Sequence, residues 1–316
     1  MITRRLARPA SAFASSAWTC PACTRASIIP QTRLPQQQRR AHHVPPLTFD
    51  ETFRQDGIPG LLSDQGFRIA WTDYQALLVQ KLNELTAGEP TENAQTKDLA
   101  LQFARNPMAA SLFNHASMAH NNHFFFSTLS TAPMKLDKLP TLEQSLCNTF
   151  GSIATLEMTM LDTAASMFGP GFVWLIWARN LDNSSVGGGS KLRGSWRILT
   201  TYLAGTPYAE AGYRQQGIDG NNQNAKSYDE YMRVTPPVGA FGAYSKSGQE
   251  QAKLPPGGTN VLPVLCVNTW EHVWLRDYGI NGKRTFLKDW WDAIDWAAVE
   301  QKTPREASQP VQFHRA

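Results

Sequence analysis

The stretch that decides the fold is Val267-Asn268-Thr269-Trp270-Glu271-His272-Val273-Trp274-Leu275-Arg276-Asp277-Tyr278. The apolar run that leads into it, from Val261, indicates a buried strand, and helical periodicity follows at once. Asn268 and His272 lie four residues apart, so one helical face can carry both side chains. An imidazole at position 272 and a carboxylate at position 268 would form a pair of metal ligands. Position 268 is an amide, so the pair lacks its anionic member.

Length and composition indicate a globular protein with one large or two modest cores. The chain has 316 residues, of which 42% are hydrophobic and 18% charged, and these values are typical of soluble proteins. No apolar run is long enough to span a bilayer, so we expect no membrane partner.

The N-terminal region contains many arginines but no acidic residue before Asp50. An Arg-rich, Ser-rich and acid-poor N-terminus is typical of an organellar targeting segment. We therefore predict a mitochondrial presequence over residues 1–43 and a location in the mitochondrial matrix; a disordered basic tail is the alternative. The arginines of this region are Arg4, Arg5, Arg8, Arg25, Arg33, Arg39 and Arg40.

Removal of the presequence reverses the sign of the net charge. The whole chain has 30 basic and 26 acidic residues. Without the seven arginines, 23 basic residues remain against 26 acidic ones, which gives a net charge of −3. A protein that wraps nucleic acid by charge alone is therefore not expected.

The pattern after the presequence predicts an α+β chain in two parts. The first part, residues 44–133, is a helical hairpin whose first helix starts near Thr72 or Asp73, and whose second helix covers residues 112–129. The second part, residues 134–302, is an α/β domain that opens with a capping box of Thr141 and Gln144.

Three β-rich runs in the second part predict its strands. A long polar segment, residues 206–258, interrupts them and is predicted to be a surface insertion. Residues 303–316 are predicted to be a polar tail. The three predicted strands are residues 172–177, 196–203 and 261–267.

Histidines and cysteines are the other candidate metal ligands. His120 and His123 lie on one face of the second predicted helix, and His115 lies earlier on the same helix. Hydrogen-bonded core histidines are the alternative in so apolar a helix. Cys147 and Cys266 lie in apolar surroundings and are expected to be buried and reduced. Cys20 and Cys23 have the spacing of a redox or zinc pair, but they lie inside the presequence, which favours coincidence.

The order of these parts resembles the iron/manganese superoxide dismutase fold, an N-terminal helical hairpin followed by an α/β domain with a three-stranded antiparallel sheet. Asn268-Thr269-Trp270-Glu271-His272 resembles the Asp-Val-Trp-Glu-His segment of that family. His120-Asn121-Asn122-His123-Phe124-Phe125-Phe126 resembles its His-x-Asn-His segment. Phe168-Gly169-Pro170-Gly171-Phe172-Val173-Trp174-Leu175 resembles its Phe-Gly-Ser-Gly-Trp-x-Trp-Leu.

The resemblance implies where a metal would bind, because the family holds its metal with three histidines and one aspartate. His120 and His272 match two of the histidines. Asn268 stands at the aspartate position, and Ala70 at the position of the first histidine. Two imidazoles without an anionic ligand form a weak site. We therefore predict a protein without metal, without cofactor and without enzymatic activity.

Two further positions of the family's active site are changed. Leu78 stands at the position of the gateway tyrosine, and Ala204 near that of the glutamine that binds the metal-bound solvent. The resemblance thus implies a scaffold without its chemistry, and this combination resembles the dismutase-like proteins of the fungal mitochondrial small ribosomal subunit. Those proteins imply a structural role in mitochondrial translation.

The same resemblance implies partners. The glutamate of the Trp-Glu-His block crosses the dimer interface in the dismutases, so Glu271 is a candidate interface residue; a local helix-start carboxylate is the alternative. The family's other cross-dimer pair falls on Tyr74 and Leu275, which favours an unlike partner, a related dismutase-fold subunit in a heterodimer. Local contacts with rRNA are expected from a basic cluster, Lys191, Arg193 and Arg197.

Two other functions remain open from the sequence. One is an active metal-dependent dismutase with an altered ligand set, drawn from His115, His120, His123 and His272. The other is a mitochondrial binding module with no relation to ribosomes.

Overall fold

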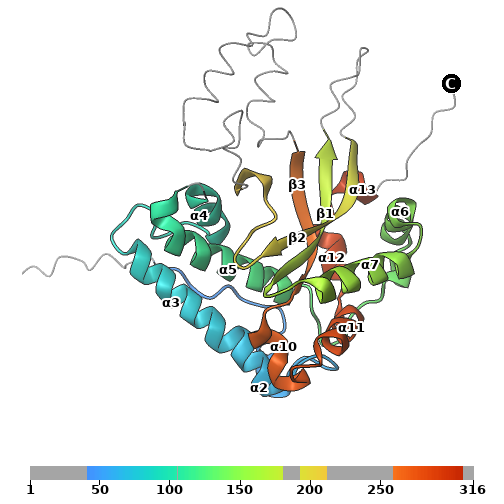
Figure 1. Cartoon of the computed structure of the whole chain (residues 1–316), viewed down its shortest axis with the longest axis horizontal. Coiled ribbons are helices and arrows are strands. Elements are labelled where there is room, and N and C mark those ends of the chain that lie inside the picture. The colour runs from blue at the N-terminus through green and yellow to red at the C-terminus, as the bar shows by residue number, and fades with distance from the viewer. Residues whose placement is uncertain (1–40, 105, 181–192, 212–258, 309–316) are drawn as a thin grey trace, which may run out of the picture. The chain divides into compact units, whose positions relative to one another are not determined.

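A computed structural model describes residues 41–104, 106–180, 193–211 and 259–308 of the chain (Figure 1). These residues belong to one compact unit. The first half is helical. Its elements are α1 (Asp50–Asp56), α2 (Asp64–Phe67), the π-helical segment η1 (Arg68–Asp73), α3 (Tyr74–Thr86), α4 (Thr96–Phe103), the 3-10 turn η2 (Pro107–Ala109) and α5 (Ala110–Phe126).

The second half carries the strands and the remaining helices. In chain order these are η3 (Leu136–Lys138), α6 (Pro140–Phe150), α7 (Ile153–Ser166), β1 (Gly171–Asn180), β2 (Arg193–Tyr202), η4 (Ala209–Ala211), β3 (Thr259–Asn268), α10 (Glu271–Tyr278), α11 (Lys283–Ala293), α12 (Trp296–Lys302) and α13 (Arg305–Ser308). The three strands lie where the β-rich runs predicted them.

The strands form one antiparallel sheet in the order β2-β1-β3. The central strand β1 is buried along most of its length, which explains its unbroken apolar sequence. Its pairing with β3 shifts register between Leu175 and Ile176, where Pro263 enters the ladder. This irregularity lies on an edge strand, where the missing N–H of a proline is tolerated. Helices α5 and α12 pack against β3, whereas α6, α7 and α13 pack against β1 and β2.

The first long helix starts earlier than the sequence predicted. It begins at Asp64, where the Ser63 hydroxyl accepts a hydrogen bond from the Gly66 N–H at 3.0 Å, and it continues through η1 into α3. Thr72 and Asp73 therefore lie inside the helix, and the prediction that one of them caps it is wrong. The π-helical turn adds a residue to the helix, so the 3.6-residue apolar periodicity is broken there and only resumes afterwards.

The predicted capping box of α6 is also wrong. The helix begins at Pro140, with no side-chain cap, and Thr141 already lies within its first turn. Proline is favoured at this position because its fixed φ suits a helix and its missing N–H would have no partner there. The capping hydroxyl of the next helix is Ser152, which accepts from the Thr155 N–H at 3.1 Å.

Edge-to-face aromatic contacts join the N-terminal helices. Phe67 lies between Phe53 and Phe126, with ring centroids 5.4 and 5.5 Å apart, and Trp71 contacts Phe126 at 5.4 Å. All four side chains are at most 1% exposed. These contacts place α1, α2, η1 and the end of α5 in one layer.

Residues on either side of the predicted boundary at 133–134 contact the C-terminal helices. The Asp295 N–H donates to the Thr128 carbonyl at 2.9 Å, and the Trp296 N–H donates to the Met134 carbonyl at 3.1 Å. The α10 helix also contacts α2, because the Asp277 carboxylate accepts from the Ser63 N–H at 2.8 Å. A Cβ at position 66 would collide with Asp277 Oδ2, so a larger residue there would displace that carboxylate from its present position.

Part of the segment predicted to be a surface insertion is buried. Residues 206–211 follow β2 and place Pro207 and Tyr208 in the interior, so the prediction is wrong for them, while residues 212–258 lie outside the described part. None of the helices in the described ranges is both long and apolar enough to cross a bilayer.

Candidate functional site

The end of β3, the π-helical segment and α5 meet at the centre of the fold. Asn268 is the last residue of β3, Ala70 lies in η1, and Asn122 lies in α5; all three are fully buried. The Asn122 side chain connects them: its Nδ2 donates to the Ala70 carbonyl at 3.2 Å, and its Oδ1 accepts from Asn268 Nδ2 at 3.2 Å. The two ligand positions that the sequence found lost therefore lie on either side of one asparagine.

The hydrogen bonds continue from Asn122 into α3. Asn122 Nδ2 also donates to Gln75 Oε1 at 3.2 Å, and Gln75 Nε2 donates to the Ala119 carbonyl at 3.0 Å. At the other end, Asn268 Oδ1 accepts from the Trp270 N–H at 3.0 Å, which fixes the turn between β3 and α10. We call Gln75, Asn122 and Asn268 the amide network. All three side chains are neutral and fully buried.

The sequence did not indicate Asn122 or Gln75 as residues of this centre. The prediction gave the α5 ligand position to His120, whereas the side chain of α5 that hydrogen-bonds to residues 70 and 268 is that of Asn122. A signal was present: Asn121, Asn122 and Gln75 are polar residues at buried positions of otherwise apolar helices, and buried amides must find hydrogen-bond partners.

His120 faces the segment after β2 instead. Its Nε2 shares a hydrogen bond with the Tyr208 hydroxyl at 2.9 Å, and Lys97 Nζ lies 4.3 Å from the centroid of the Tyr208 ring. Burial, together with the nearby charges of His123 and Lys97, lowers the pKa of His120 to about 4. His120 is thus a neutral core histidine, the alternative that the sequence left open.

His272 is the one residue at an implied ligand position that keeps a ligand side chain. Its ring stacks on Tyr74, with centroids 4.1 Å apart, and lies 5.7 Å from Trp270. Burial lowers its pKa to about 4. Its Nε2 is buried and has no hydrogen-bond partner among the described residues. The imidazole is therefore neutral, and its free nitrogen is the group that a metal would use.

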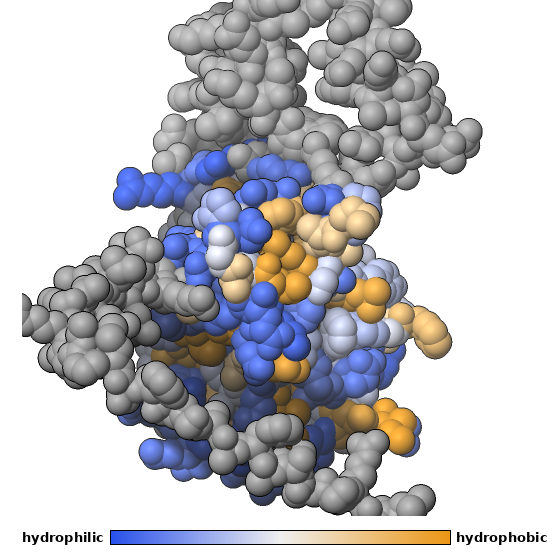
Figure 2. Space-filling view, turned by 90° about the vertical axis from the view of Figure 1, so that its left-hand side faces the viewer, coloured by the Kyte–Doolittle hydropathy of each residue, from blue (hydrophilic) through white to orange (hydrophobic). Residues whose placement is uncertain are grey.

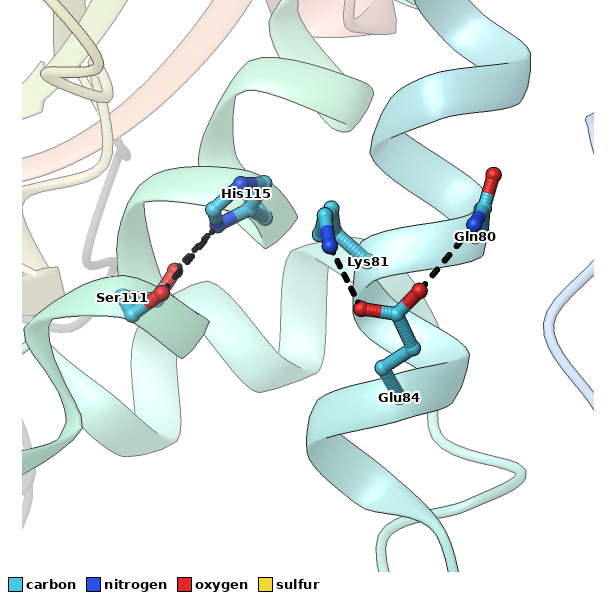
Figure 3. Close-up of polar contacts among 5 residues, drawn as sticks. All are labelled: Gln80, Lys81, Glu84, Ser111 and His115. Carbon is cyan, nitrogen blue, oxygen red and sulfur yellow. Dashed lines mark hydrogen bonds and ion pairs between the residues drawn. The ribbon is translucent and has the colours of Figure 1, made fainter. Parts of the chain in front are cut away.

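The other histidines do not join this centre. His115 is half-buried on α5, where its Nδ1 contacts the Ser111 carbonyl at 2.7 Å (Figure 3). Nearby on α3, Lys81 and Gln80 bind the two oxygens of Glu84 (Figure 3). His123 packs on Trp71, with ring centroids 5.9 Å apart. The altered ligand set of His115, His120, His123 and His272 is therefore not assembled.

The residues at the centre do not fit a dismutase metal. Within the described ranges, no group of three or more histidine, cysteine, aspartate or glutamate side chains could hold a metal ion. Leu78 and Ala204, at the gateway and solvent-glutamine positions, are both buried and apolar. Neutral amides, one free imidazole nitrogen and no carboxylate supply too little charge for a divalent or trivalent ion.

The candidate interface residues lie at the surface. Glu271 is exposed in the first turn of α10, Leu275 is 40% exposed on the same helix, and Tyr74 is half-buried. Apolar side chains also reach the surface on the side of the molecule that carries α3 and α4 (Figure 2); on α3 they include Leu77 and Leu85, which are 49% and 40% exposed.

The remaining sequence candidates are only partly described. Lys191, Cys20 and Cys23 lie outside the described residues, and Arg193 is the first residue of β2. Arg197 is exposed on β2. Cys266 is a fully buried free thiol whose pKa burial raises, as expected of an inert core residue, whereas Cys147 is free and only half-buried.

The C-terminal part of the chain matches a known family. Residues 243–302 match the model described as "Iron/manganese superoxide dismutases, C-terminal domain". The chain is also 21% identical over 242 residues to the iron superoxide dismutase of Babesia bovis, a match that covers 74% of this chain and 84% of that protein. The predicted α+β fold, an iron/manganese superoxide dismutase-like fold with a helical first half and a three-stranded antiparallel sheet, is thereby confirmed.

Two relatives from the fungus Schizosaccharomyces pombe are more similar. Small ribosomal subunit protein mS43 is 25% identical over 268 residues, which cover 83% of this chain and 84% of that protein. Small ribosomal subunit protein mS42 is 27% identical over 253 residues, which cover 78% of this chain and 90% of that protein. The resemblance to dismutase-like proteins of the fungal mitochondrial small ribosomal subunit, predicted from the sequence, is confirmed.

Proposed function

We propose that this protein is a structural component of the mitochondrial small ribosomal subunit and has no enzymatic activity. The observation that carries the proposal is its likeness, over about four-fifths of its length, to two fungal small-subunit proteins. The centre of the fold supports it, because neutral amides stand where a dismutase needs an anionic ligand. The location proposed is the mitochondrial matrix, where such a subunit assembles.

The partner proposed is a second dismutase-fold subunit, and the proposed contact surface surrounds Glu271. Exposed apolar side chains next to α10 support this surface: Phe168 is 96% exposed and Leu203 is 60% exposed. The Leu203 N–H donates to the Pro170 carbonyl at 2.9 Å, and the Thr269 N–H donates to the Gly171 carbonyl at 2.9 Å, so both segments lie beside the start of α10.

The backbone at this surface supports the same proposal. Leu203 has a φ of 52°, a left-handed conformation that non-glycine residues rarely adopt. Strained backbone conformations cluster at functional sites, so the strained and exposed Leu203 supports a binding surface here. Contacts with rRNA are proposed to be local and to come from Lys191, Arg193 and Arg197.

Gradient sedimentation of mitochondrial lysate tests this function. We expect the tagged protein to migrate with the small ribosomal subunit at low salt. High salt should weaken the phosphate contacts of Lys191, Arg193 and Arg197, because those contacts are screened, while a buried apolar interface with the partner persists. Migration apart from the small subunit at every salt concentration would reject the ribosomal assignment and favour a separate binding module.

Charge reversal tests the partner surface separately. Glu271→Lys is expected to release the partner after a high-salt wash. The matched control is Glu51→Lys, which also reverses an exposed glutamate in the first turn of a helix and should leave the partner bound. If the partner stays bound to Glu271→Lys, the surface around Glu271 is not the interface, whatever the gradient shows.

The sequence predicts a presequence that ends at residue 43, but the hydrogen bonds of His42 lead us to expect the mature N-terminus at or before His42. The His42 N–H donates to Asn83 Oδ1 at 2.7 Å, Asn83 Nδ2 donates back to the His42 carbonyl at 3.1 Å, and the His42 ring shares a hydrogen bond with Thr86 at 3.1 Å. At about 1 kcal/mol for each hydrogen bond, a protein that starts at Pro45 should lose roughly 2–3 kcal/mol of stability relative to one that starts at Ala41.

N-terminal sequencing of the protein from mitochondria, together with urea unfolding of the two truncated forms, checks this. The Asn83→Ala variant of the longer form is the control, because it should lose stability in the same way without any change in length. A mature protein that begins after His42, or equal stability of the two forms, would contradict the expectation.

A further inference from the structure

We propose that the amide network is a metal substitute. It is a permanent polar cross-link between α3, α5 and β3, at the place where a dismutase holds its metal, and Asn122 stands in the α5 ligand position. The inference concerns the centre of the fold and does not depend on what the chain assembles with. It rests on the direction of each hydrogen bond, on charge, and on the separate engagement of His120.

Every side-chain oxygen of the amide network already accepts a hydrogen bond. Asn268 Oδ1 accepts from the Trp270 N–H, Asn122 Oδ1 accepts from Asn268 Nδ2, and Gln75 Oε1 accepts from Asn122 Nδ2. Both N–H groups of Asn122 are used, since they also bind the Ala70 carbonyl. A metal would have to compete with an N–H donor at every side-chain oxygen.

The charge of the side chains at this place also disfavours a bound metal. A buried cation needs anionic ligands to offset the loss of its hydration, and the described residues gather no carboxylate or thiolate cluster at this place. The side chains at the four implied positions are those of Ala70, Asn122, Asn268 and His272. A polar cross-link needs no such compensation, because neutral amides satisfy one another.

His120 cannot serve as the missing ligand without breaking other contacts. Its Nε2 is engaged with the Tyr208 hydroxyl, and Lys97 lies over the Tyr208 ring. Residues 120 and 122 are two positions apart on α5, which is a rotation of about 200° around a helix. The side chain that turns toward Asn268 is therefore that of Asn122.

Two sets of substitutions test whether position 120 or position 122 is the α5 ligand position. The double variant A70H/N268D keeps His120 and His272, so it has a full ligand set if His120 is in place. The triple variant A70H/N122H/N268D adds a histidine at position 122. Each purified protein is stripped with chelator, its melting temperature is measured with EDTA or with Mn²⁺, and its bound metal is counted by elemental analysis.

The wild type and the double variant are expected to show no Mn²⁺-dependent change in melting temperature and no stoichiometric metal. The triple variant is expected to retain about one metal ion per chain after washing. Its melting temperature should rise by roughly 5–10 °C at a Mn²⁺ concentration about 100 times Kd. Metal retained by the wild type, equal binding by the double variant, or a folded triple variant without metal would each overturn the proposal.

The single variant N122H keeps the inference testable if the triple variant does not fold. It places a histidine at the position that hydrogen-bonds Asn268, which lies four residues before His272, and two imidazoles bind Ni²⁺ or Zn²⁺ more readily than one. The expected result is a rise in melting temperature with Ni²⁺ in N122H that the wild type lacks. The same Ni²⁺ response in both proteins, or none in a folded N122H, would overturn the assignment of position 122 as the α5 ligand position.

Discussion

Asn122→Ala is expected to lower the free energy of unfolding by roughly 3–5 kcal/mol, because it leaves three buried groups without partners. Those groups are the Ala70 carbonyl, Gln75 Oε1 and Asn268 Nδ2. Each unsatisfied buried group costs about 1–3 kcal/mol, and water entering the small cavity offsets part of the sum. The change is large because one side chain joins the helical half of the chain to the sheet.

The neighbouring residue supplies the control. Asn121 is also fully buried on α5, but its Nδ2 makes one hydrogen bond, to the Gly205 carbonyl at 2.8 Å, and its Oδ1 has no partner in the described structure. Asn121→Ala should therefore cost about 1–2 kcal/mol. Urea unfolding of both variants measures the difference. Equal losses would show that the network contributes no more than any buried asparagine.

Acidification from pH 7 to pH 5 is expected to lower the free energy of unfolding by about 4 kcal/mol. The pKa values of His120 and His272 are about 4 in the folded chain, against an ordinary value of 6.5. Between these values the unfolded chain binds more protons than the folded chain, so stability falls as the pH falls. The loss begins near pH 6.5 and is complete below about pH 4; at pH 5 each histidine accounts for about 2 kcal/mol.

Single substitutions assign this loss. His120→Gln and His272→Gln should each remove about half of the change in stability between pH 7 and pH 5. His42 and His123, whose pKa values burial also lowers, act in the same direction. The variant that carries both His120→Gln and His272→Gln should therefore keep a smaller dependence of stability on pH. If that variant keeps the full pH dependence of the wild type, the assignment is contradicted.

The sequence by itself determined the strands and the order of the parts. The runs around Trp174 and Val264 are apolar without interruption, because each strand is covered by helices or a neighbouring strand, and such runs are visible without tertiary information. The run around Trp196 is shorter in apolar residues and includes the exposed Arg197. The sequence also determined that position 268 carries no charge, because the side-chain amide of asparagine is neutral in any fold. The absence of an anionic ligand followed from that one residue.

The sequence misplaced the start of the first helix and the beginning of the insertion for a physical reason. The π-helical turn at Arg68–Asp73 changes the rotation of the helix, so the apolar pattern on either side of it does not share one period. Tyr208, in residues 206–211, is buried and contacts His120 and Lys97, which lie far away in the sequence, and a polar, Gly- and Pro-rich segment gives no local sign of such contacts.

Only the tertiary structure decided which residue of α5 faces the centre. His120, Asn122 and His123 lie within one turn of the helix, and a change of two residues rotates a side chain by about 200°. Motif matching fixes position along the chain to within a residue or two, which is too coarse to choose a face. The packing of Phe126 against Phe67 and Trp71 fixes the rotation of α5, and that rotation turns Asn122 toward Asn268 and His120 toward Tyr208.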